Sequence, residues 1–306
     1  MGSRIEPTRL RDLSLAPAAG TADFVSAASG LVRVGSHLYV IADDALELAA
    51  FDIDGQAPGR RIRLFSGALP VEKARRKRMK PDIEALVWLE PDSRFPNGAL
   101  LALGSGSTAL RRRGALLAMD SQGRVAGAAQ PINVSPLYAH LDLLVPELNI
   151  EGAVATGGEM LLFNRGNRSH PENAMIRVGL REALASCIDG ATFNASVRTC
   201  PLPLGETQGV PFTVTDATAL PDGRLVATAV AENTADAYND GACIGSAVAL
   251  LTADGVLLAM HEFAMPLKVE GVAATIEADR IDLLLVTDAD DPAVPAGFYQ
   301  AALPLP

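Results

Sequence analysis

Short apolar or alternating segments follow one another along almost the whole chain, and turn signals separate them. Such a pattern is typical of antiparallel β-strands. Asp-Gly pairs between apolar runs, the strongest short signal of a hairpin, occur at 54–55, 222–223 and 254–255. Only Leu137–Val145 and Leu180–Ser186 have the pattern of short helices. We therefore predict an all-β fold made of small antiparallel sheets.

A five-residue phrase recurs at the head of successive groups of these segments. Its copies are Ala27–Leu31, Asp82–Leu86, Asn149–Ala153, Asp216–Leu220 and Lys268–Val272. The middle residues, which are 55, 67, 67 and 52 residues apart, are Ser29, Glu84, Glu151, Thr218 and Glu270. Self-similarity at a roughly fixed period indicates a repeat architecture.

Each of the first four copies heads a unit of four strands, and the units span 29–66, 83–134, 150–203 and 216–264. The fifth unit, 269–305, holds three strands, and the alternating segment Arg9–Ala16 can supply the fourth. Pairing the two ends of the chain in one blade closes a ring and removes open sheet edges. We predict one domain over 1–306, a five-bladed β-propeller closed by an N-terminal strand in its last blade.

Two other architectures would use the same strands. A six-bladed propeller would need an extra blade within the insertions 134–148 or 233–245. A β-sandwich would also accommodate short strands, but it would not explain why one phrase stands at the head of every four-strand unit.

Composition narrows the class of protein. Apolar residues make up 49% of the 306 residues, which is ample for a core. The net charge of −10 argues against a nucleic-acid partner, which would call for an extended basic surface. The N-terminus has no signal-like apolar region, and no stretch approaches the ~20 apolar residues of a spanning helix, so we expect no membrane partner and a cytoplasmic location.

Cysteine, histidine and serine patterns argue against several chemistries. Cys187, Cys200 and Cys243 lack metal or disulfide spacing, and we interpret them as buried small residues. The four histidines lack metal spacing too. No Gly-x-Ser-x-Gly elbow lies between a strand and a helix, so nucleophile-based hydrolysis has little support and no catalytic residue is assigned.

The repeat places polar residues together. In a propeller the innermost strand of each blade runs beside the central channel, and its starting end shares a face with the loop after the second strand. The middle residues should converge at one channel mouth, with Asp82, Asn149, Asp216 and Lys268 just before them. The second-strand exits add further polar groups at Asp43–Asp44, 104–108, 164–167, Glu232–Asn233 and 288–291.

Carboxylate, amide and hydroxyl oxygens without His or Cys are what a hard cation such as Ca²⁺ prefers. Crowded carboxylates also repel one another unless a cation or a shared proton neutralises them. The candidate metal ligands are Glu84, Glu151, Glu270, Asn149 and Asp216. Alternatively, a repeated Glu fixes its blade by accepting backbone N–H bonds, and it then repeats because the blade repeats.

The basic run Arg75–Lys80 directly precedes the second copy of the phrase, and its ordinary interpretation is a solvated loop. Arg111–Arg113 and Arg165 are expected on the same face. Arg side chains and glycine N–H groups suit phosphate or carboxylate recognition, which suggests a small anionic ligand. The candidate substrate-binding residues are Lys80, Ser105, Arg112 and Arg165.

The segments Lys80–Leu86, Asn149–Gly152 and Val269–Val272 resemble the inner-strand starts of the bacterial phytase-like and SdiA-regulated propellers, where an acidic residue precedes a small one. More distantly, the chain is similar to lactonase and gluconolactonase propellers, which place a Glu-Gly at this point as a calcium ligand. That resemblance implies Ca²⁺ ligation by Glu84, Glu151 and Glu270, and the phytase-like one implies phosphoester hydrolysis. Ser29 and Thr218 depart from the pattern.

The leading hypothesis is a metal-dependent hydrolase that acts on a phosphoester or a lactone at the channel mouth. The alternative is a non-catalytic propeller that binds a ligand or a protein through its polar face. Loss of turnover in EDTA, with recovery on Ca²⁺ addition, would separate the two.

Overall fold

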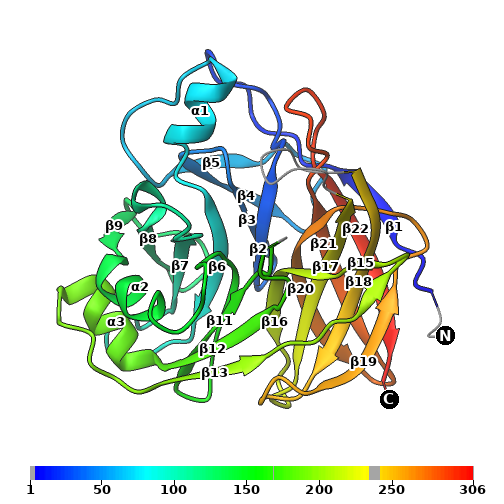
Figure 1. Cartoon of the computed structure of the whole chain (residues 1–306). Helices are drawn as coiled ribbons and strands as arrows, with labels where there is room; N and C mark the ends of the chain where they lie inside the picture. Colours follow the sequence, from blue (N-terminus) through cyan, green and yellow to red (C-terminus); the bar gives the residue numbers. More distant parts are fainter. Residues whose placement is uncertain (1–3, 168, 234–241, 306) are drawn as a thin grey trace.

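Five four-stranded antiparallel sheets form a ring in the computed structural model, which describes residues 4–167, 169–233 and 242–305 (Figure 1). The predicted five-bladed propeller is confirmed. The first three sheets are β2 Ala28–Val34, β3 His37–Ala42, β4 Glu47–Asp52 and β5 Arg60–Arg63; β6 Ile83–Leu89, β7 Ala99–Gly104, β8 Arg113–Ala118 and β9 Gln130–Asn133; and β10 Ile150–Thr156, β11 Glu159–Asn164, β12 Ala174–Gly179 and β13 Val197–Pro201.

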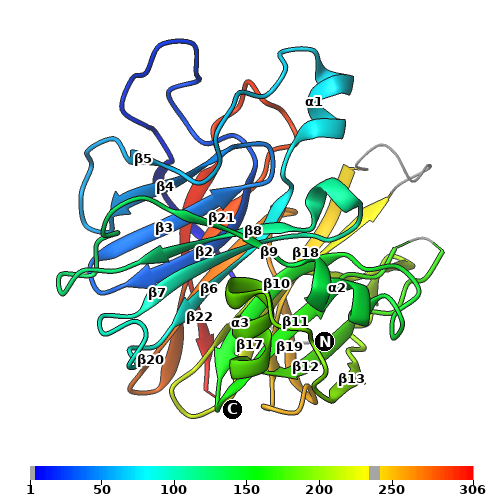
Figure 2. The same ribbon diagram turned by 90° about the vertical axis from the view of Figure 1, so that its left-hand side faces the viewer.

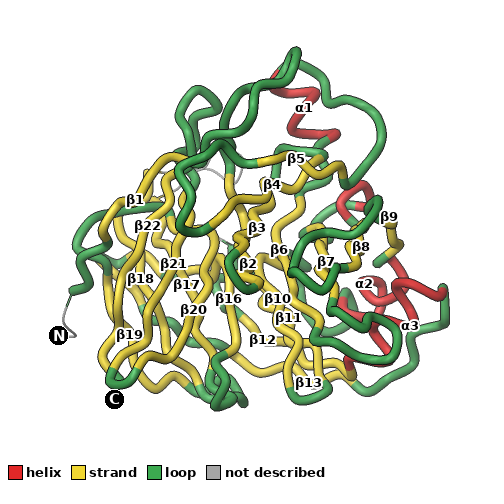
Figure 3. Tube along the Cα trace, turned by 180° about the vertical axis from the view of Figure 1, so that it is seen from behind, coloured by secondary structure: helices red, strands yellow, loops and turns green. Residues whose placement is uncertain are grey.

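The fourth sheet consists of β16 Thr213–Ala219, β17 Leu225–Asn233, β18 Ala242–Leu251 and β19 Leu257–Glu262, and a two-strand hairpin, β14 Glu206–Thr207 and β15 Val210–Pro211, precedes it. The fifth sheet contains β20 Val269–Glu277, β21 Arg280–Thr287, β22 Gly297–Pro304 and, at its outer edge, β1 Thr8–Asp12. β1 pairs antiparallel with β22, so the predicted N-terminal closing strand is confirmed and joins the two ends of the chain in one blade (Figure 3).

No sixth blade occurs in the described parts of the two insertions. The first insertion folds as helix α2 Ser135–Leu141, and 242–245 belong to β18. The stretch 234–241, where the alternative also placed strands, lies outside the described residues.

The core is divided into five clusters, one between each pair of neighbouring blades. β7 shows how the sequence produces this division: Leu101 and Leu103 pack toward the third blade, while Leu100 and Ala102 pack toward the first. Because successive strand residues point to opposite faces and both faces are covered, the second strand of a blade is a continuous apolar run. All six residues of β7 are buried.

The three short α-helices of the described residues lie outside the ring of strands (Figure 2). α2 and α3 Leu180–Asp189 pack together over the core between the second and third blades, where Tyr138 and Cys187 are buried. The helices expected at Leu137–Val145 and Leu180–Ser186 are thus present. The three cysteines are free; Cys187 is buried, whereas Cys200 and Cys243 are only half-buried.

The basic run is a helix, and its interpretation as a loop was wrong. α1 Lys73–Met79 begins where the Glu72 carboxylate accepts the N–H groups of Ala74 and Arg75, both at 2.9 Å. Lys, Arg, Ala and Met are strong helix formers, and the charge pattern gives no sign of this. Within the described residues, no helix is long and apolar enough to span a bilayer.

Candidate functional site

Every inner strand carries a β-bulge at its start, and the bulge identifies the true repeat. The strand pairing shifts by one residue at Ser29, Glu84, Glu151 and Glu270, the middle residues of four copies of the phrase. In the fourth blade the shift falls at Thr215, between Val214 and Asp216. A bulge leaves one residue out of the ladder and re-aims its side chain. These five residues occupy equivalent positions at one end of the channel, the bulge end.

The register assigned to the fourth blade from the sequence was therefore wrong by three residues. Thr218 pairs with Val226 farther along β16, and its position has no equivalence to Glu84 or Glu151. Asp216–Leu220 resembles the phrase in its small and apolar residues, but it begins one residue after the bulged Thr215. The correct counterpart of Ser29 is Thr215.

The two hydroxyl residues at the bulge link neighbouring blades. Ser29 Oγ donates to the carbonyl of Ile83 at 2.6 Å, and Thr215 Oγ1 donates to that of Val269 at 2.7 Å. In both cases the acceptor directly precedes the bulged Glu of the next blade. Within the described residues the three Glu side chains do not make this link; Glu151 contacts Arg165 and Glu270 contacts Lys268 instead. The mixture of Glu and hydroxyl residues thus reflects two structural roles at one position.

Asp216, a candidate metal ligand, lies deeper in the channel. The residue after the bulge is small in the other blades because the inner strands approach closely: a Cβ on Gly152 would lie 3.0 Å from the Cα of Asp216. The Asp216 carboxylate accepts the N–H groups of Ala217 and Val272 at 2.8 and 2.9 Å, and that of Leu31 as well. Burial raises its pKa well above the usual value, against the effect of these bonds. Asp216 thereby joins three blades through the backbone.

Charged side chains from all five blades gather at the bulge end, and we call this set the acidic rim. It contains eight carboxylates and four cations. They are Asp43, Asp82, Glu84, Glu151, Glu232, Glu270, Asp288 and Asp290, with Lys80, Arg111, Arg165 and Lys268.

On the side of the first two blades, Asp82 is the centre of the rim. Its carboxylate lies 2.9 Å from Lys80 Nζ and 2.8 Å from an Arg111 nitrogen, and it accepts from Ser105 Oγ at 2.6 Å. Lys80 also pairs with Asp43. Asp82 itself has φ 54°, a left-handed conformation that a short polar side chain tolerates. The basic side chains here hold carboxylates in place.

Two half-buried cations organise the opposite side of the rim. Arg165 bridges Glu151 at 3.3 Å and Glu232 at 2.5 Å, and Asn149 Nδ2 donates to Glu151 at 2.6 Å. Lys268 lies 3.2 Å from Glu232 and 3.7 Å from Glu270.

Lys268 also lies 3.9 Å from Asp288 and 2.5 Å from Asp290. Burial alone would lower the pKa of the Lys268 ammonium, but the carboxylates around it, Glu270 and Glu232 above all, more than offset this and raise it.

Glu84 differs from the rest of the rim. Within the described residues its carboxylate makes no hydrogen bond or ion pair, although oxygens of Asp43, Asp82 and Glu84 all lie within 4.8 Å of one another. Burial raises its pKa well above the usual value, and the charges of Asp82 and Glu151 add to this, with Lys80 opposing. Among the described residues, Glu84 is thus the carboxylate of the rim without an ion-pair partner.

Two other carboxylates of the rim have pKa values near neutrality. Burial, opposed by Lys80, raises the pKa of Asp43 to about 6. Burial, opposed by Lys268, raises that of Asp288 to about 7. Asp288 and Lys268 line a pocket of 500 Å³ on the fifth blade, and Asp288 is close enough to Asp43 for their charges to interact.

The residues selected as anion ligands are engaged elsewhere. Lys80 and Arg165 are each shared between two carboxylates, and Ser105 is fully buried against Asp82. Arg112 pairs with Asp142 at 2.7 Å, beside α2. Of the metal candidates, Glu84, Glu151 and Glu270 share the rim, Asn149 binds Glu151, and Asp216 lies deeper. The second-strand exits did bring further carboxylates to this face: Asp43, Glu232, Asp288 and Asp290.

Comparisons with solved structures support the propeller architecture. The α-L-arabinofuranosidase PaAbf62A of Podospora anserina, solved with cellotriose, aligns with a TM-score of 0.54 at 10% identity over 98% of both chains. A luciferin-regenerating enzyme aligns with a TM-score of 0.48 at 12% identity, over 97% of this chain and 95% of that one. At 10% identity, the likeness to PaAbf62A shows a shared fold only. No curated protein sequence matches.

A family model matches residues 24–303, which is nearly the whole propeller, and its description is a family of unknown function, DUF6929. The resemblance to phytase-like and SdiA-regulated propellers is supported at the level of the β-propeller fold, and the family itself is a different one. The chain belongs to the DUF6929 family.

Proposed function

We propose that this propeller binds a divalent cation, Ca²⁺ in the first place, at Glu84 on the acidic rim, and uses it to hydrolyse a small neutral ester or lactone. The observation that carries the proposal is the Glu84 carboxylate, which has no partner among the described residues yet lies beside Asp43 and Asp82. A hard divalent cation would neutralise this excess of negative charge through oxygen ligands alone.

The donor set fits a hard cation. Asp43, Asp82 and Glu84 each offer a carboxylate oxygen within 4.8 Å of the others. Lys80 pairs with Asp43 and Asp82, but a carboxylate has about four lone-pair sites and keeps some free beside one ammonium. Ser105 and Arg111 hold the orientation of Asp82, as groups around metal ligands commonly do. These three carboxylates are the proposed ligands.

The charge of the rim favours a neutral substrate over a phosphoester. Its four cations are all paired with carboxylates, and the carboxylates outnumber them two to one. An anionic substrate would therefore be repelled unless the bound cation attracted it. A lactone or an ester brings no net charge to the face.

Asp288 is the proposed general base. Its pKa of about 7 lies close to the operating range of an enzyme, and its side chain lines the 500 Å³ pocket next to Lys268. Above that pKa an Asp288 carboxylate oxygen can accept a proton from an attacking water, while Lys268 keeps the carboxylate in position. A Ca²⁺ ion, when bound, would polarise the carbonyl of the substrate.

Calorimetric titration with CaCl₂ tests the cation site, with Glu84→Gln as the variant. The matched control is Glu206→Gln on the exposed hairpin of β14. We expect binding by the wild-type and control proteins and none by Glu84→Gln. Absence of Ca²⁺ binding by the wild-type protein, or unchanged binding by Glu84→Gln, would refute the site.

Turnover is tested separately on a panel of γ-lactones, aryl acetates and aryl phosphates, with EDTA and with added Ca²⁺. We expect hydrolysis of a lactone or an acetate that EDTA abolishes and Ca²⁺ restores. Asp288→Asn should lower kcat by about 100-fold or more, the contribution of a general base, and leave Ca²⁺ binding intact. Cation binding without turnover on any substrate would favour the alternative, a ligand-binding propeller.

A further inference from the structure

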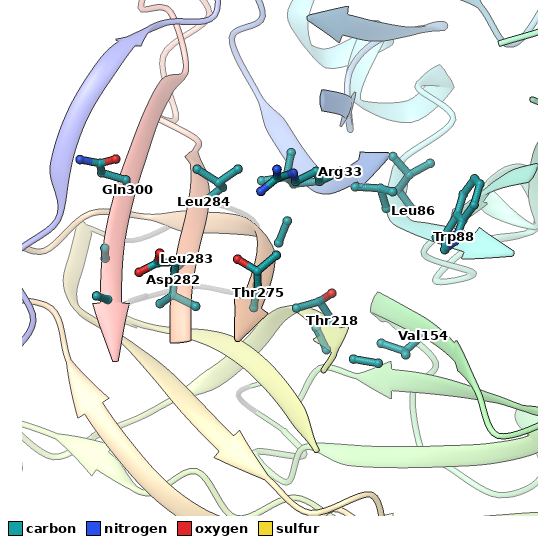
Figure 4. Close-up of a pocket in the computed structure, with 18 of the residues that line it drawn as sticks. Arg33, Leu86, Trp88, Val154, Thr218, Thr275, Asp282, Leu283, Leu284 and Gln300 are labelled. Atoms are coloured by element: carbon teal, nitrogen blue, oxygen red, sulfur yellow. The ribbon is translucent and has the colours of Figure 1, made fainter. Parts of the chain in front are cut away.

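The end of the channel opposite the acidic rim contains a cavity with a volume of 640 Å³ (Figure 4). The second halves of the five inner strands form its wall together with residues of β21, β22 and the N-terminal segment. Asp216 and the close-packed glycines lie between it and the bulge end, since the residues that follow them in each strand line the cavity. We call it the far-end cavity.

Small side chains leave this space open. The inner strands place Ala153, Ala155, Ala217, Ala219 and Ala273 along the wall. These alanines also pack against the apolar clusters between the blades. A volume of 640 Å³ lies within the range of about 300–1,000 Å³ usual for small-molecule sites.

Two threonines of neighbouring inner strands contribute polar groups to the wall. The hydroxyls of Thr218 and Thr275 point toward the interior, whereas Gln300 is exposed on β22, two strands outward from β20 (Figure 4). Within the described residues, none of these three side chains makes a hydrogen bond. Convergent and uncommitted donors and acceptors in a concave site are what a hydroxyl-bearing ligand requires.

An aromatic ring borders the same cavity. Trp88, the single tryptophan of the chain, is half-buried with its ring packed on the backbone of Gly98, where a Cβ would lie 2.2 Å from the indole. Its indole N–H has no hydrogen-bond partner among the described residues. A fixed ring with a free N–H offers one flat apolar contact and one donor.

The charges disfavour an anionic ligand, since four carboxylates (Glu6, Glu90, Glu277 and Asp282) and two arginines line the wall. Arg280 is neutralised by Asp282 at 2.6 Å, and Arg33 is accompanied by the exposed carboxylates Glu90 and Glu277 around the opening. No excess of basic groups is present among the described residues of the wall to attract an anion. We infer that the far-end cavity is a binding site for a neutral polyhydroxylated molecule of mono- to disaccharide size, held by Thr218 and Thr275 against Trp88.

Tryptophan fluorescence reports this site alone, because Trp88 is the only tryptophan. The probes are glucose, cellobiose and myo-inositol, titrated to tens of millimolar, with glucuronate as the charged comparison. We expect at least one neutral probe to shift or quench the emission in a saturable way, and glucuronate to bind more weakly. No saturable change with any neutral probe, or preference for glucuronate, would overturn the inference.

Thr218→Val and Thr275→Val remove one hydroxyl each at nearly constant volume and keep the fluorophore. Each should weaken the binding of the responding probe by about threefold to tenfold, the value of one hydrogen bond. Glu206→Gln, on the exposed hairpin of β14, serves as the control and should leave it unchanged. Wild-type affinity in both Thr variants would overturn the inference. Because this titration needs neither Ca²⁺ nor turnover, failure of one site is distinguishable from failure of the other.

Discussion

Replacing Glu84 by Gln should stabilise the metal-free protein at alkaline pH, although the residue lies half-buried among charged groups. The substitution keeps the shape of the side chain and removes one charge. With oxygens of Asp43 and Asp82 within 4.8 Å, each like-charge pair costs about 3 kcal/mol at an effective dielectric constant of about 20. Lys80 offsets part of this repulsion. We expect a net gain of about 2 kcal/mol in the free energy of unfolding at pH 8.

The gain should depend on pH in a defined direction. Burial raises the pKa of Glu84 in the folded protein well above the value of 4.5 that applies to the unfolded chain. At pH 4.5 and below, folded Glu84 is protonated and resembles Gln, so the two proteins should be equally stable. As the pH rises above 4.5, the unfolded chain releases its proton first, and the wild-type protein loses stability until the folded pKa is passed.

Urea unfolding at pH 4.5 and pH 8, in EDTA, measures this difference. Glu206→Gln, on an exposed strand, should match the wild-type protein at both pH values. A Glu84→Gln variant that is less stable than wild type at pH 8 would refute the reasoning, because it would show that Glu84 has a favourable partner. A gain that is the same at both pH values would show that it has no electrostatic origin.

Three further outcomes follow from the geometry. Asp288→Asn should flatten the pH dependence of the free energy of unfolding between about pH 4 and pH 7. In the wild-type protein, protonated Asp288 contributes stability at acid pH, and this contribution is lost as the pH rises through its pKa of about 7. Urea titrations across this pH range measure the difference. Thr215→Val should lower the free energy of unfolding by about 1–3 kcal/mol, because it leaves the buried carbonyl of Val269 without its hydrogen-bond donor. Thr218→Val should lower it by less than about 0.5 kcal/mol. Equal costs would contradict the assignment of Thr215 to the bulge. Gly152→Ala should lower the midpoint of thermal unfolding by an amount equivalent to about 1–3 kcal/mol. The reason is that the new Cβ would lie 2.9 Å from the backbone nitrogen of Ala217. An unchanged midpoint would show that the inner strands can move apart.

Much of the fold could be predicted because its signals are local. Apolar alternation and Asp-Gly turns define the strands, and the count of strands behind each phrase yields five blades. The three strands of the last unit and the alternating N-terminal segment predict the ring closure seen between β1 and β22. These inferences need only strand geometry and the requirement that sheet edges be paired.

The candidate site was predictable in place but not in detail. The starts of the inner strands and the exits of the second strands do converge on the acidic rim. The partners there are distant in the sequence: Lys80 pairs with Asp43, and Arg165 with Glu232, which is 67 residues away. Sequence distance carries no information on which cation neutralises which carboxylate, so Lys80 and Arg165 could be mistaken for anion ligands.

The residue pattern alone thus settles the strands, their number and the ring, since these depend on neighbours along the chain and on alternation between two faces. It does not settle the role of each residue at the bulge. A hydrogen bond to the carbonyl of Val269, 54 residues away, distinguishes Thr215 from Thr218. Hydrogen bonds that Asp216 accepts from backbone amides of two other blades distinguish it from a metal ligand. Only packing the blades around a common channel brings those groups within bonding distance.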